Sequence, residues 1–405
     1  MTSSAIYMSF AKLREMRHFN ADLHLHSRFS IAASPKIDLA GMCKTARMKG
    51  IQVLGTGDCL HRVWLEELES SLEKRGDVYE IDGIAYVLQT EVETTVKGRV
   101  HHLILFPSFS SAHELRDALM EGGYSLLSGG RPQLKMSPEK LVGLVSEVNA
   151  LAGPSHAFTP WTSMYSAYDT ICDCYKENVE LVTFLELGLS ADTMMASALA
   201  ELDSCTFVSF SDAHSAAPDK LGREFTRFLL QRPSFREIDR AFQGAKGRGV
   251  VLNVGLDPRE GKYHLTGCRR CKKAYELKDV VRNGKVLKTC PECGGPLKIG
   301  VKDRIQLLAL KSCKVPLTQR PRYVHAVPLL EILKAMKRSC PMNVKKDYHE
   351  LLQEFDNEIN ILIDASLDDL KERHPKLAAV LGRFRKDVID FEFVGRGGWY
   401  GKIKI

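Results

Sequence analysis

Residues 20–27 read NADLHLHS, so His24 and His26 end an apolar run. A second stretch, SFSDAHS at residues 209–215, ends another apolar run with an aspartate and a histidine at the same spacing. Side chains two residues apart on a β-strand point to the same face, so each pair projects together. Imidazole and carboxylate groups suit Zn, Mn or Fe. We therefore expect the two stretches to meet around a metal cluster.

The composition predicts a globular chain with a real core. Its 405 residues are 44% hydrophobic and 26% charged, and the length favours two or three domains. No run approaches the ~20 apolar residues of a membrane span. Charged residues interrupt the N-terminal stretch where a secretion signal would be apolar, so we expect a cytoplasmic protein. Its eleven cysteines then predict metal ligands and buried thiols rather than disulfides.

The net charge of +7 is unevenly distributed. Residues 261–325 hold 16 Lys and Arg but only 4 Asp and Glu, so the rest of the chain is mildly acidic. A concentrated basic block favours a polyanionic partner, and we predict nucleic acid. The simpler alternative is a solvated basic surface.

Short apolar runs alternate with helical patterns between residues 20 and 215. Residues 39–50 and 137–151 have apolar positions at helical spacing, whereas 84–95 and 99–107 are rich in strand-forming residues. Repeated β-α units with polar residues at strand ends predict an α/β fold built on a parallel-strand barrel. Active sites of such barrels lie at the C-terminal ends of the strands. We assign the barrel to residues 1–260.

Two Cys-x2-Cys pairs define a second module, which we place at residues 261–300. Cys268 and Cys271 are separated by 18 residues from Cys290 and Cys293. This spacing is typical of a zinc ribbon, in which four thiolates hold one structural zinc ion. The alternative of four free thiols explains the spacing poorly. A closed four-thiolate site stabilises its module and carries no chemistry itself.

The remaining segment, residues 301–405, is predicted to be a C-terminal helical region that binds DNA. Residues 348–365 and 367–385 have the pattern of two packed helices, and residues 389–405 are rich in glycine, aromatic and basic residues.

Most polar candidates of the barrel segment lie at the ends of predicted strands. A lone histidine is more often a packed residue than a ligand, but a cluster of them favours a multinuclear site. Carboxylates such as Glu91 can bridge two metals, and metals about 3.5–4 Å apart suit phosphodiester hydrolysis. The candidates are His24, His26, Asp58, His61, Glu91, Glu93, His101, His102, His156, Asp212 and His214.

The motifs DLHLHS, GTGDCLH, QTEVE, VHHLILF, GPSHA and SFSDAHS, within residues 18–260, resemble the polymerase-and-histidinol-phosphatase (PHP) superfamily. That resemblance implies a distorted β/α barrel with a trinuclear metal site that hydrolyses phosphoesters. With the four-Cys module and the segment RPRYVHAVPLLEIL, the whole chain resembles the endonuclease Q family. Members of that family nick DNA on the 5′ side of deaminated bases (uracil, hypoxanthine, xanthine) and abasic sites.

The resemblance implies a set of active-site ligands. Of two adjacent histidines, His102 matches the third motif better than His101, because the apolar LILF follows it directly. Glu91 is favoured over Glu93 as the bridging carboxylate. The implied ligands are His24, His26, Asp58, His61, Glu91, His102, His156, Asp212 and His214.

Two positions depart from the family pattern. Cys59 follows Asp58 where many PHP proteins have a histidine, and His61 is the candidate replacement. Ala32 stands where a further histidine is common, so the third metal position either uses His61 and His214 or is weakly occupied.

The implied activity is hydrolysis with two or three divalent metals, drawn from Zn, Mn, Fe and Mg. Asp212 and His156 are the candidates to position or deprotonate the attacking water. The implied partner is DNA with damaged bases, a sliding clamp is a second candidate partner, and no membrane is involved. Trp161, Tyr323, Trp399 and Tyr400 are candidates to stack on an extruded base, with simple packing as the alternative.

Two other functions fit parts of the sequence. A small-molecule phosphatase would use the same cluster but leaves the zinc ribbon and the basic block without a role. A nucleic-acid-binding protein with a degenerate barrel would explain Ala32, but not the nearly complete ligand set.

Overall fold

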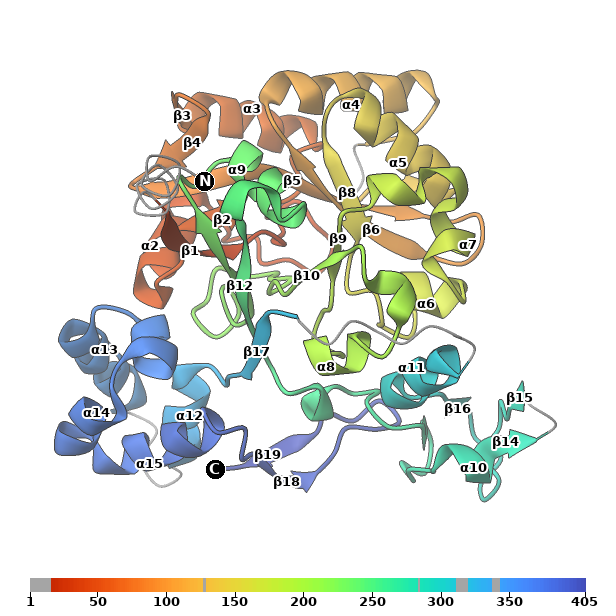
Figure 1. The fold of residues 1–405 in the computed structure, drawn as a ribbon, viewed down its shortest axis with the longest axis vertical. Helices are drawn as coiled ribbons and strands as arrows, with labels where there is room; N and C mark the ends of the chain where they lie inside the picture. Colours follow the sequence, from red (N-terminus) through yellow and green to blue (C-terminus); the bar gives the residue numbers. More distant parts are fainter. Residues whose placement is uncertain (1–15, 127–128, 283–284, 311–319, 337–342) are drawn as a thin grey trace, which may run out of the picture.

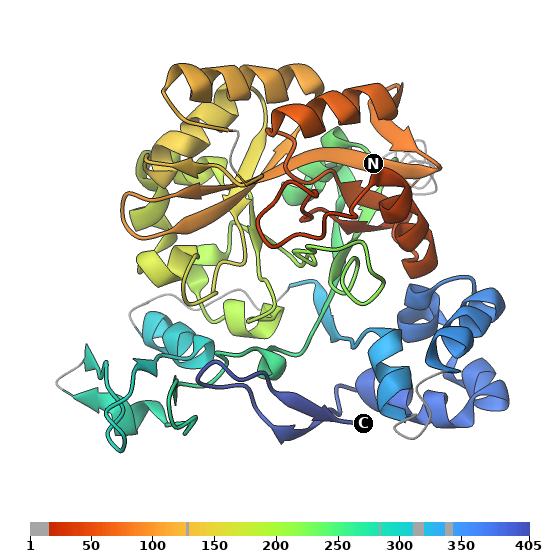
Figure 2. The same cartoon turned by 180° about the vertical axis from the view of Figure 1, so that it is seen from behind.

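The computed structural model describes residues 16–126, 129–282, 285–310, 320–336 and 343–405 (Figure 1). A mixed α/β body contains the residues up to about 255. The two opposite views in Figures 1 and 2 show that most of the segments after residue 260 form a layer along one side of this body. No described helix combines the length and apolar character needed to cross a membrane.

Eleven strands of the described residues form one sheet with the hydrogen-bonded order β17-β12-β11-β1-β2-β5-β4-β3. Strands β6 and β7 pair with β5, and β8 pairs with β6. Their bounds are β1 Arg17–Asp22, β2 Val53–Gly55, β3 Glu73–Arg75, β4 Val78–Ile81, β5 Ile84–Thr94, β6 Val100–Phe106, β7 Gln133–Leu134, β8 Leu151–Pro154, β11 Phe225–Leu230, β12 Gly249–Gly255 and β17 Arg322–His325. A separate parallel pair consists of β9 Phe184–Glu186 and β10 Thr206–Val208.

The sheet is mixed rather than purely parallel. Strands β1, β2 and β5 are parallel to one another, as predicted, but β5 and β6 form an antiparallel hairpin. Only residues 95–99 connect β5 to β6, and a connection this short cannot make the crossover that parallel strands need. The predicted α/β class is confirmed, while the prediction of a parallel-strand barrel was wrong at this hairpin and at β11.

Inward-facing side chains from seven strands share one buried cluster, so the strands enclose a common interior. The members from these strands are Phe19, Ala21, Val53, Ala85, Val87, Leu103, Leu105, Phe184, Val208, Phe228 and Leu230. The separate β9–β10 pair lies between β8 and β12: the Asn253 side-chain amide donates to the Phe207 carbonyl at 2.9 Å. On the other side, the Ala157 N–H donates to the Glu186 carbonyl at 2.9 Å.

Helices cover the outside of the strands, and their ends follow the sequence. Helix α2 begins where Asp38 accepts the Gly41 N–H and ends at Gly50, whose φ of 86° suits glycine. Both predicted helices, at 39–50 and 137–151, are confirmed. The barrel helices are α2 Leu39–Lys49, α3 Arg62–Ser71, α4 Phe109–Glu121, α5 Pro138–Glu147, α6 Met164–Ala167, α7 Ile171–Tyr175, α8 Thr193–Ala196 and α9 Phe235–Phe242.

The cysteine-rich module has little regular structure. It contains β13 Gly267–Cys268, α10 Leu277–Val280, β14 Val281–Arg282, β15 Lys285–Val286 and β16 Leu297–Lys298. The C-terminal hairpin, β18 Asp390–Phe393 and β19 Lys402–Lys404, lies against it: Leu265 and Arg396 form a parallel bridge.

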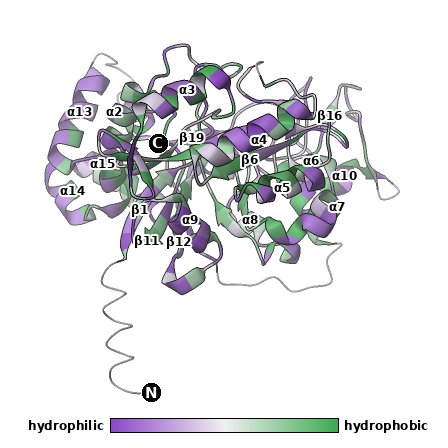
Figure 3. Cartoon of the chain, turned by 90° about the horizontal axis from the view of Figure 1, so that it is seen from above, coloured by the Kyte–Doolittle hydropathy of each residue, from purple (hydrophilic) through white to green (hydrophobic). Residues whose placement is uncertain are grey.

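A helical unit with its own core completes the chain. It consists of α12 Leu329–Met336, α13 Val344–Phe355, α14 Leu367–Arg373 and α15 Pro375–Phe384. Figure 3 shows this unit and α10 at opposite ends of the molecule. The predicted unit boundaries at 260 and 300 stay a prediction. However, α11 Val301–Ala309 and β17 pack with the barrel, so the helical unit starts after β17.

Candidate functional site

The two predicted stretches meet in the structure. Leu25 and Ala213 form a parallel bridge, and the His26 N–H donates to the Ala213 carbonyl at 3.0 Å. Asp212 Oδ1 consequently lies 3.0 Å from His26 Nε2 and 3.6 Å from His24 Nε2. His24, His26 and Asp212 bring their ligand atoms within 4.8 Å of one another, which is close enough to hold one metal ion. The predicted convergence of the two stretches is confirmed.

A second group lies beside the first, and Glu91 links the two. Glu91 Oε1 lies 2.8 Å from His101 Nδ1 and 3.2 Å from His156 Nε2, and these three residues also qualify as a metal-binding group. The same carboxylate lies 3.7 Å from His24 Nε2 and 3.6 Å from His26 Nε2. Glu91 therefore has the position of a bridging ligand.

The histidine of the third motif was predicted wrongly. In the β5–β6 hairpin, Glu93 lies opposite His101, and directly opposed residues share a face. His102 faces the other way, where Nε2 lies 3.0 Å from the Thr94 hydroxyl and Nδ1 lies 3.2 Å from the Tyr175 hydroxyl. His101 is thus the residue that reaches the site, and His102 is a packed residue between sheet and helix.

Glu93 lies behind His101 rather than between the two groups. Its Oε2 accepts from His101 Nε2 at 2.9 Å and from Arg99 Nε at 2.7 Å. Glu93 consequently orients the His101 ring, and the geometry favours Glu91 as the bridging ligand.

The second-motif residues have different surroundings. Asp58 Oδ1 lies 3.1 Å from His26 Nδ1, and its Oδ2 accepts the Ser27 N–H at 2.7 Å, so Asp58 holds the His26 ring. His61 lies outside both groups, with its ring stacked on Phe29 at 4.2 Å between centroids.

His214 is the remaining predicted ligand. Its ring lies 4.2 Å from that of His26, and its Nδ1 lies 3.0 Å from the carbonyl oxygen of Asp212. His214 is therefore adjacent to the first group without being part of it. Its role as a ligand, like that of Asp58 and His61, stays a prediction.

The sequence analysis missed Glu186, which orients two site histidines. Its carboxylate lies 2.8 Å from His24 Nδ1 and accepts the His156 N–H at 2.9 Å. Because Nδ1 is engaged, His24 directs Nε2 towards Glu91 and Asp212, and this buried nitrogen has no hydrogen-bond partner among the described residues. Glu186 ends strand β9, so the signal was the same as for the other candidates: an acidic residue at the end of an apolar run.

Arg131 was missed as well. Arg131 lies in the segment just before β7. Its Nη1 donates to Glu91 Oε2 at a distance of 2.9 Å. No motif marks this arginine, because its contact with Glu91 joins residues 40 positions apart in the sequence.

The electrostatics of the site suit cations. Burial alone lowers the pKa of His24 and of His26, but the surrounding carboxylates raise the pKa of His24 well above its ordinary value and that of His26 to about 10. Buried carboxylates require positive charge close by, and imidazoles with carboxylates are ligands for Zn, Mn and Fe. The unpaired Nε2 of His24 and the position of Glu91 therefore fit a site with two metal ions.

We expect Glu186→Gln to weaken metal binding about 10- to 100-fold, which is the usual cost of losing a carboxylate that orients a ligand histidine. Titration calorimetry with Mn²⁺ would measure the change. Glu224→Gln is a matched control, because burial raises the pKa of Glu224 to about 8 and so keeps this carboxyl neutral at neutral pH. Equal losses in both variants would contradict the role assigned to Glu186.

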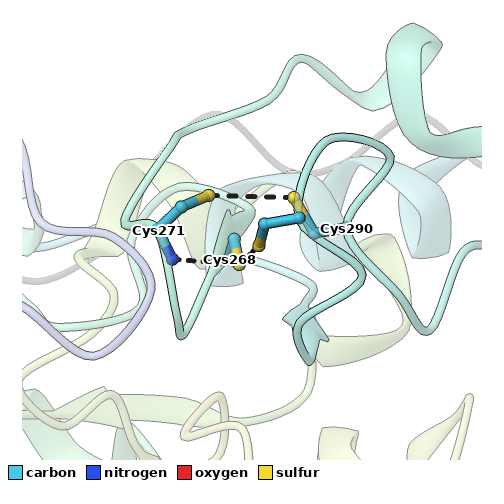
Figure 4. Close-up of side chains that lie close together, drawn as sticks. Cys268, Cys271 and Cys290 are labelled. Atoms are coloured by element: carbon cyan, nitrogen blue, oxygen red, sulfur yellow. Dashed lines mark hydrogen bonds between the residues drawn. The ribbon is translucent and has the colours of Figure 1, made fainter.

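The four cysteines of the ribbon gather as predicted. The Sγ atoms of Cys268 and Cys293 are 3.4 Å apart, and those of Cys271 and Cys290 are 3.8 Å apart. A tetrahedral zinc site with Zn–S bonds of about 2.3 Å needs sulfur separations of about 3.8 Å. Figure 4 shows three of these residues on two facing loops, with the Cys271 N–H directed at the Cys268 sulfur. The cluster fits one structural zinc ion.

Comparisons with known proteins agree with this architecture. The family model described as the MJ0043 C-terminal domain matches residues 328–388. The chain is 40% identical to MJ0043 of Methanocaldococcus jannaschii over 262 residues, which are 62% of this chain and 32% of MJ0043. It therefore spans about a third of the length of that relative. It is also 30% identical to YqxK of Bacillus subtilis, over 96% of this chain and all of YqxK.

Two solved structures match over nearly the whole chain. The lesion-specific endonuclease PfuEndoQ of Pyrococcus furiosus has 38% sequence identity and a TM-score of 0.89, with 96% of each chain covered. An Endonuclease Q bound to a 27-mer duplex substrate, with an abasic lesion at its active site, has 38% identity and a TM-score of 0.87; 96% of this chain and 97% of that chain are covered. Together with the paired metal groups and the four-cysteine module, these matches establish that the chain belongs to the endonuclease Q family of metal-dependent DNA endonucleases.

Proposed function

We propose that this chain is a DNA repair endonuclease that hydrolyses the phosphodiester on the 5′ side of abasic sites and of deaminated bases: uracil, hypoxanthine and xanthine. One observation carries the proposal. Two groups of candidate metal ligands lie side by side, with the Glu91 carboxylate of one group 3.7 Å from His24 and 3.6 Å from His26 of the other, on a fold that matches an Endonuclease Q solved with an abasic lesion at its active site.

Exposure indicates the side from which a phosphodiester approaches. The side chains of His24, His26 and Glu91 are completely buried, whereas that of Asp212 is 31% exposed. Asp212 therefore lies at the mouth of the site, and His214 beside it is equally exposed. A backbone phosphate that enters here meets Asp212 before any other member of the two groups.

The residues of the site have separate tasks in the proposed reaction. Divalent metal ions, when bound, act as Lewis acids that polarise the phosphate and acidify a water molecule. We assign to Asp212 and His156 the tasks of holding the attacking water and accepting its proton. Arg131 brings a cation to within 2.9 Å of Glu91, where it would offset charge on the scissile phosphate.

The number of metals is part of the proposal. The two groups sharing Glu91 support two positions. A third position at His61 and His214, and a sliding clamp as partner, stay predictions.

The test is a lesion panel. Labelled duplexes with uracil, hypoxanthine, an abasic analogue or no lesion are incubated with Mg²⁺, Mn²⁺ or Zn²⁺, and Asp212→Asn provides the background. We expect the lesion duplexes to be nicked on the 5′ side of the lesion. The undamaged duplex should be nicked only at the background level. Hydrolysis of small phosphoesters alone would indicate a phosphatase instead, and binding of lesion DNA without nicking would indicate a non-catalytic protein.

A further inference from the structure

Three large aromatic side chains are unusually exposed near the ribbon. Trp161 lies on the loop after β8 with 46% of its surface exposed, and Trp399 and Tyr400 lie on the loop between β18 and β19 with 52% and 63% exposed. A single exposed aromatic residue needs no explanation. Three of them, from segments far apart in the sequence, require one.

A cation lies over each of the three rings. Lys298 Nζ is 3.7 Å from the centroid of Trp161, Lys262 Nζ is 4.4 Å from that of Tyr400, and Lys272 Nζ is 5.4 Å from that of Trp399. All three lysines belong to the basic block that begins at residue 261. Each ring is therefore paired with a group that attracts phosphate.

Tyr263 lies between the two loops that carry the exposed rings. Its ring meets the indole of Trp161 edge-on, with 5.9 Å between centroids. Its hydroxyl oxygen lies 3.7 Å from the point where a Cβ of Gly398 would be, and the Gly398 N–H donates to the Lys262 carbonyl at 3.1 Å. We call Trp161, Tyr263, Trp399 and Tyr400, with the three lysines, the aromatic–basic track.

The track begins at the metal groups. The His101 N–H donates to the carbonyl of Thr162 at 3.2 Å, and the Thr159 N–H donates to the carbonyl of His156 at 3.0 Å. The loop that carries Trp161 is thus bonded at both ends to residues of the second metal group.

Backbone and side-chain contacts hold the rings in place. Lys298 Nζ donates to the Pro160 carbonyl at 2.7 Å, which ties the ribbon to the Trp161 loop. On the hairpin side, the Gly401 N–H donates to the Glu260 carbonyl at 2.8 Å. Hydrogen bonds to the neighbouring backbone therefore hold the loops that carry these rings.

We propose that the aromatic–basic track binds an unpaired DNA strand by stacking its bases on the exposed rings. Aromatic platforms alternating with cations are the usual solution for binding a single strand, since the rings take the base faces and the cations follow the phosphates. In a duplex the neighbouring base pairs cover those faces, so the track selects unpaired nucleotides. That the strand is DNA, leading away from the cleavage site, rests on the proposed function.

Tryptophan fluorescence tests the proposal directly. The chain has three tryptophans, and Trp64 is buried, so the other two report on the track. We expect a short oligothymidylate to quench this emission. A strand of equal length built from abasic units, with the same phosphates but no bases, should leave the emission nearly unchanged even where it binds, and so should an undamaged duplex. Equal quenching by the strand with bases and the strand without them would overturn the proposal.

Variants assign the effect to single rings. We expect Trp161→Leu and Trp399→Leu each to weaken oligothymidylate binding about tenfold, the effect of one lost stacking contact, and the corresponding Phe variants to restore much of it. Met194→Ala, at an apolar residue that is 83% exposed on α8, is the control and should bind like the wild type. Unchanged binding in both Leu variants would contradict the proposal.

The two proposals can fail separately. Asp212→Asn should not nick lesion DNA, yet it should still show base-dependent quenching. Quenching without lesion nicking in the wild type would refute the proposed function and leave the track standing. Nicking without base-dependent quenching would refute the track alone.

Discussion

Replacing His101 by alanine is expected to reduce lesion-dependent nicking by more than about 100-fold, which is the upper limit for losing a residue that merely orients a metal ligand. His101 Nδ1 lies 2.8 Å from the shared carboxylate Glu91, so the substitution removes a member of the second metal group. Metal content by mass spectrometry should fall together with the single-turnover rate on a uracil duplex.

The adjacent histidine provides the matched comparison. His102→Ala should nick at close to the wild-type rate but lower the free energy of unfolding by about 2–4 kcal/mol, because it leaves a cavity and deprives two buried hydroxyls of a partner. Those hydroxyls belong to Thr94 and Tyr175. The opposite result, with activity lost at His102 and kept at His101, would show that the hairpin has a different register in solution.

This pair of histidines marks the limit of what the sequence could predict. Because His24 and His26 are two residues apart on an extended segment, their side chains share one face regardless of the rest of the fold. For two adjacent histidines, the face depends on the pairing register of β5 and β6, and a shift by one residue exchanges inside for outside. The apolar run after His102 carried no information on this register, because Leu103 and Leu105 turn out to share the inward face with His101.

The sequence was also a poor guide to site residues whose roles depend on tertiary contacts. Glu186 acts on His24 across 162 positions of sequence, and Arg131 reaches Glu91 across 40. Arg131 has no local pattern that distinguishes it from any other charged residue, and the strand-end position of Glu186 does not show which histidines its carboxylate reaches. The metal groups could be predicted because local spacing determines part of their geometry, whereas the side chains that orient them depend on the completed fold.

The C-terminal half shows the same division. The four cysteines could be predicted to gather, since a Cys-x2-Cys loop requires a metal or a bond to be stable. The packing of α11 and β17 against the barrel could not be predicted, because β17 forms by pairing with a strand some 70 residues earlier. The described residues of the basic block at 261–325 therefore belong to two parts of the structure, the ribbon and one side of the barrel.

Removing the structural zinc should separate catalysis from DNA binding. The described residues of the ribbon include a core of four buried hydrophobic side chains, far too few to fold alone, and a four-thiolate zinc site supplies about 10–16 kcal/mol of folding free energy. We expect Cys290→Ser to lose the ribbon zinc and to unfold this module. Lys298 and Lys272 would lose their fixed positions, so lesion nicking should fall at physiological salt through weaker DNA binding.

The barrel, in contrast, should keep its chemistry. Its metal groups draw no residue from the ribbon, so hydrolysis of a small phosphodiester such as bis(p-nitrophenyl) phosphate should stay within about twofold of the wild type, the range of surface substitutions. Cys172→Ser is the matched control, because this exposed cysteine on α7 lies outside the four-cysteine cluster and should change neither zinc content nor activity. Equal loss on both substrates in Cys290→Ser would mean that the ribbon supports the barrel itself; no loss on lesion DNA would mean that the ribbon has no part in binding it.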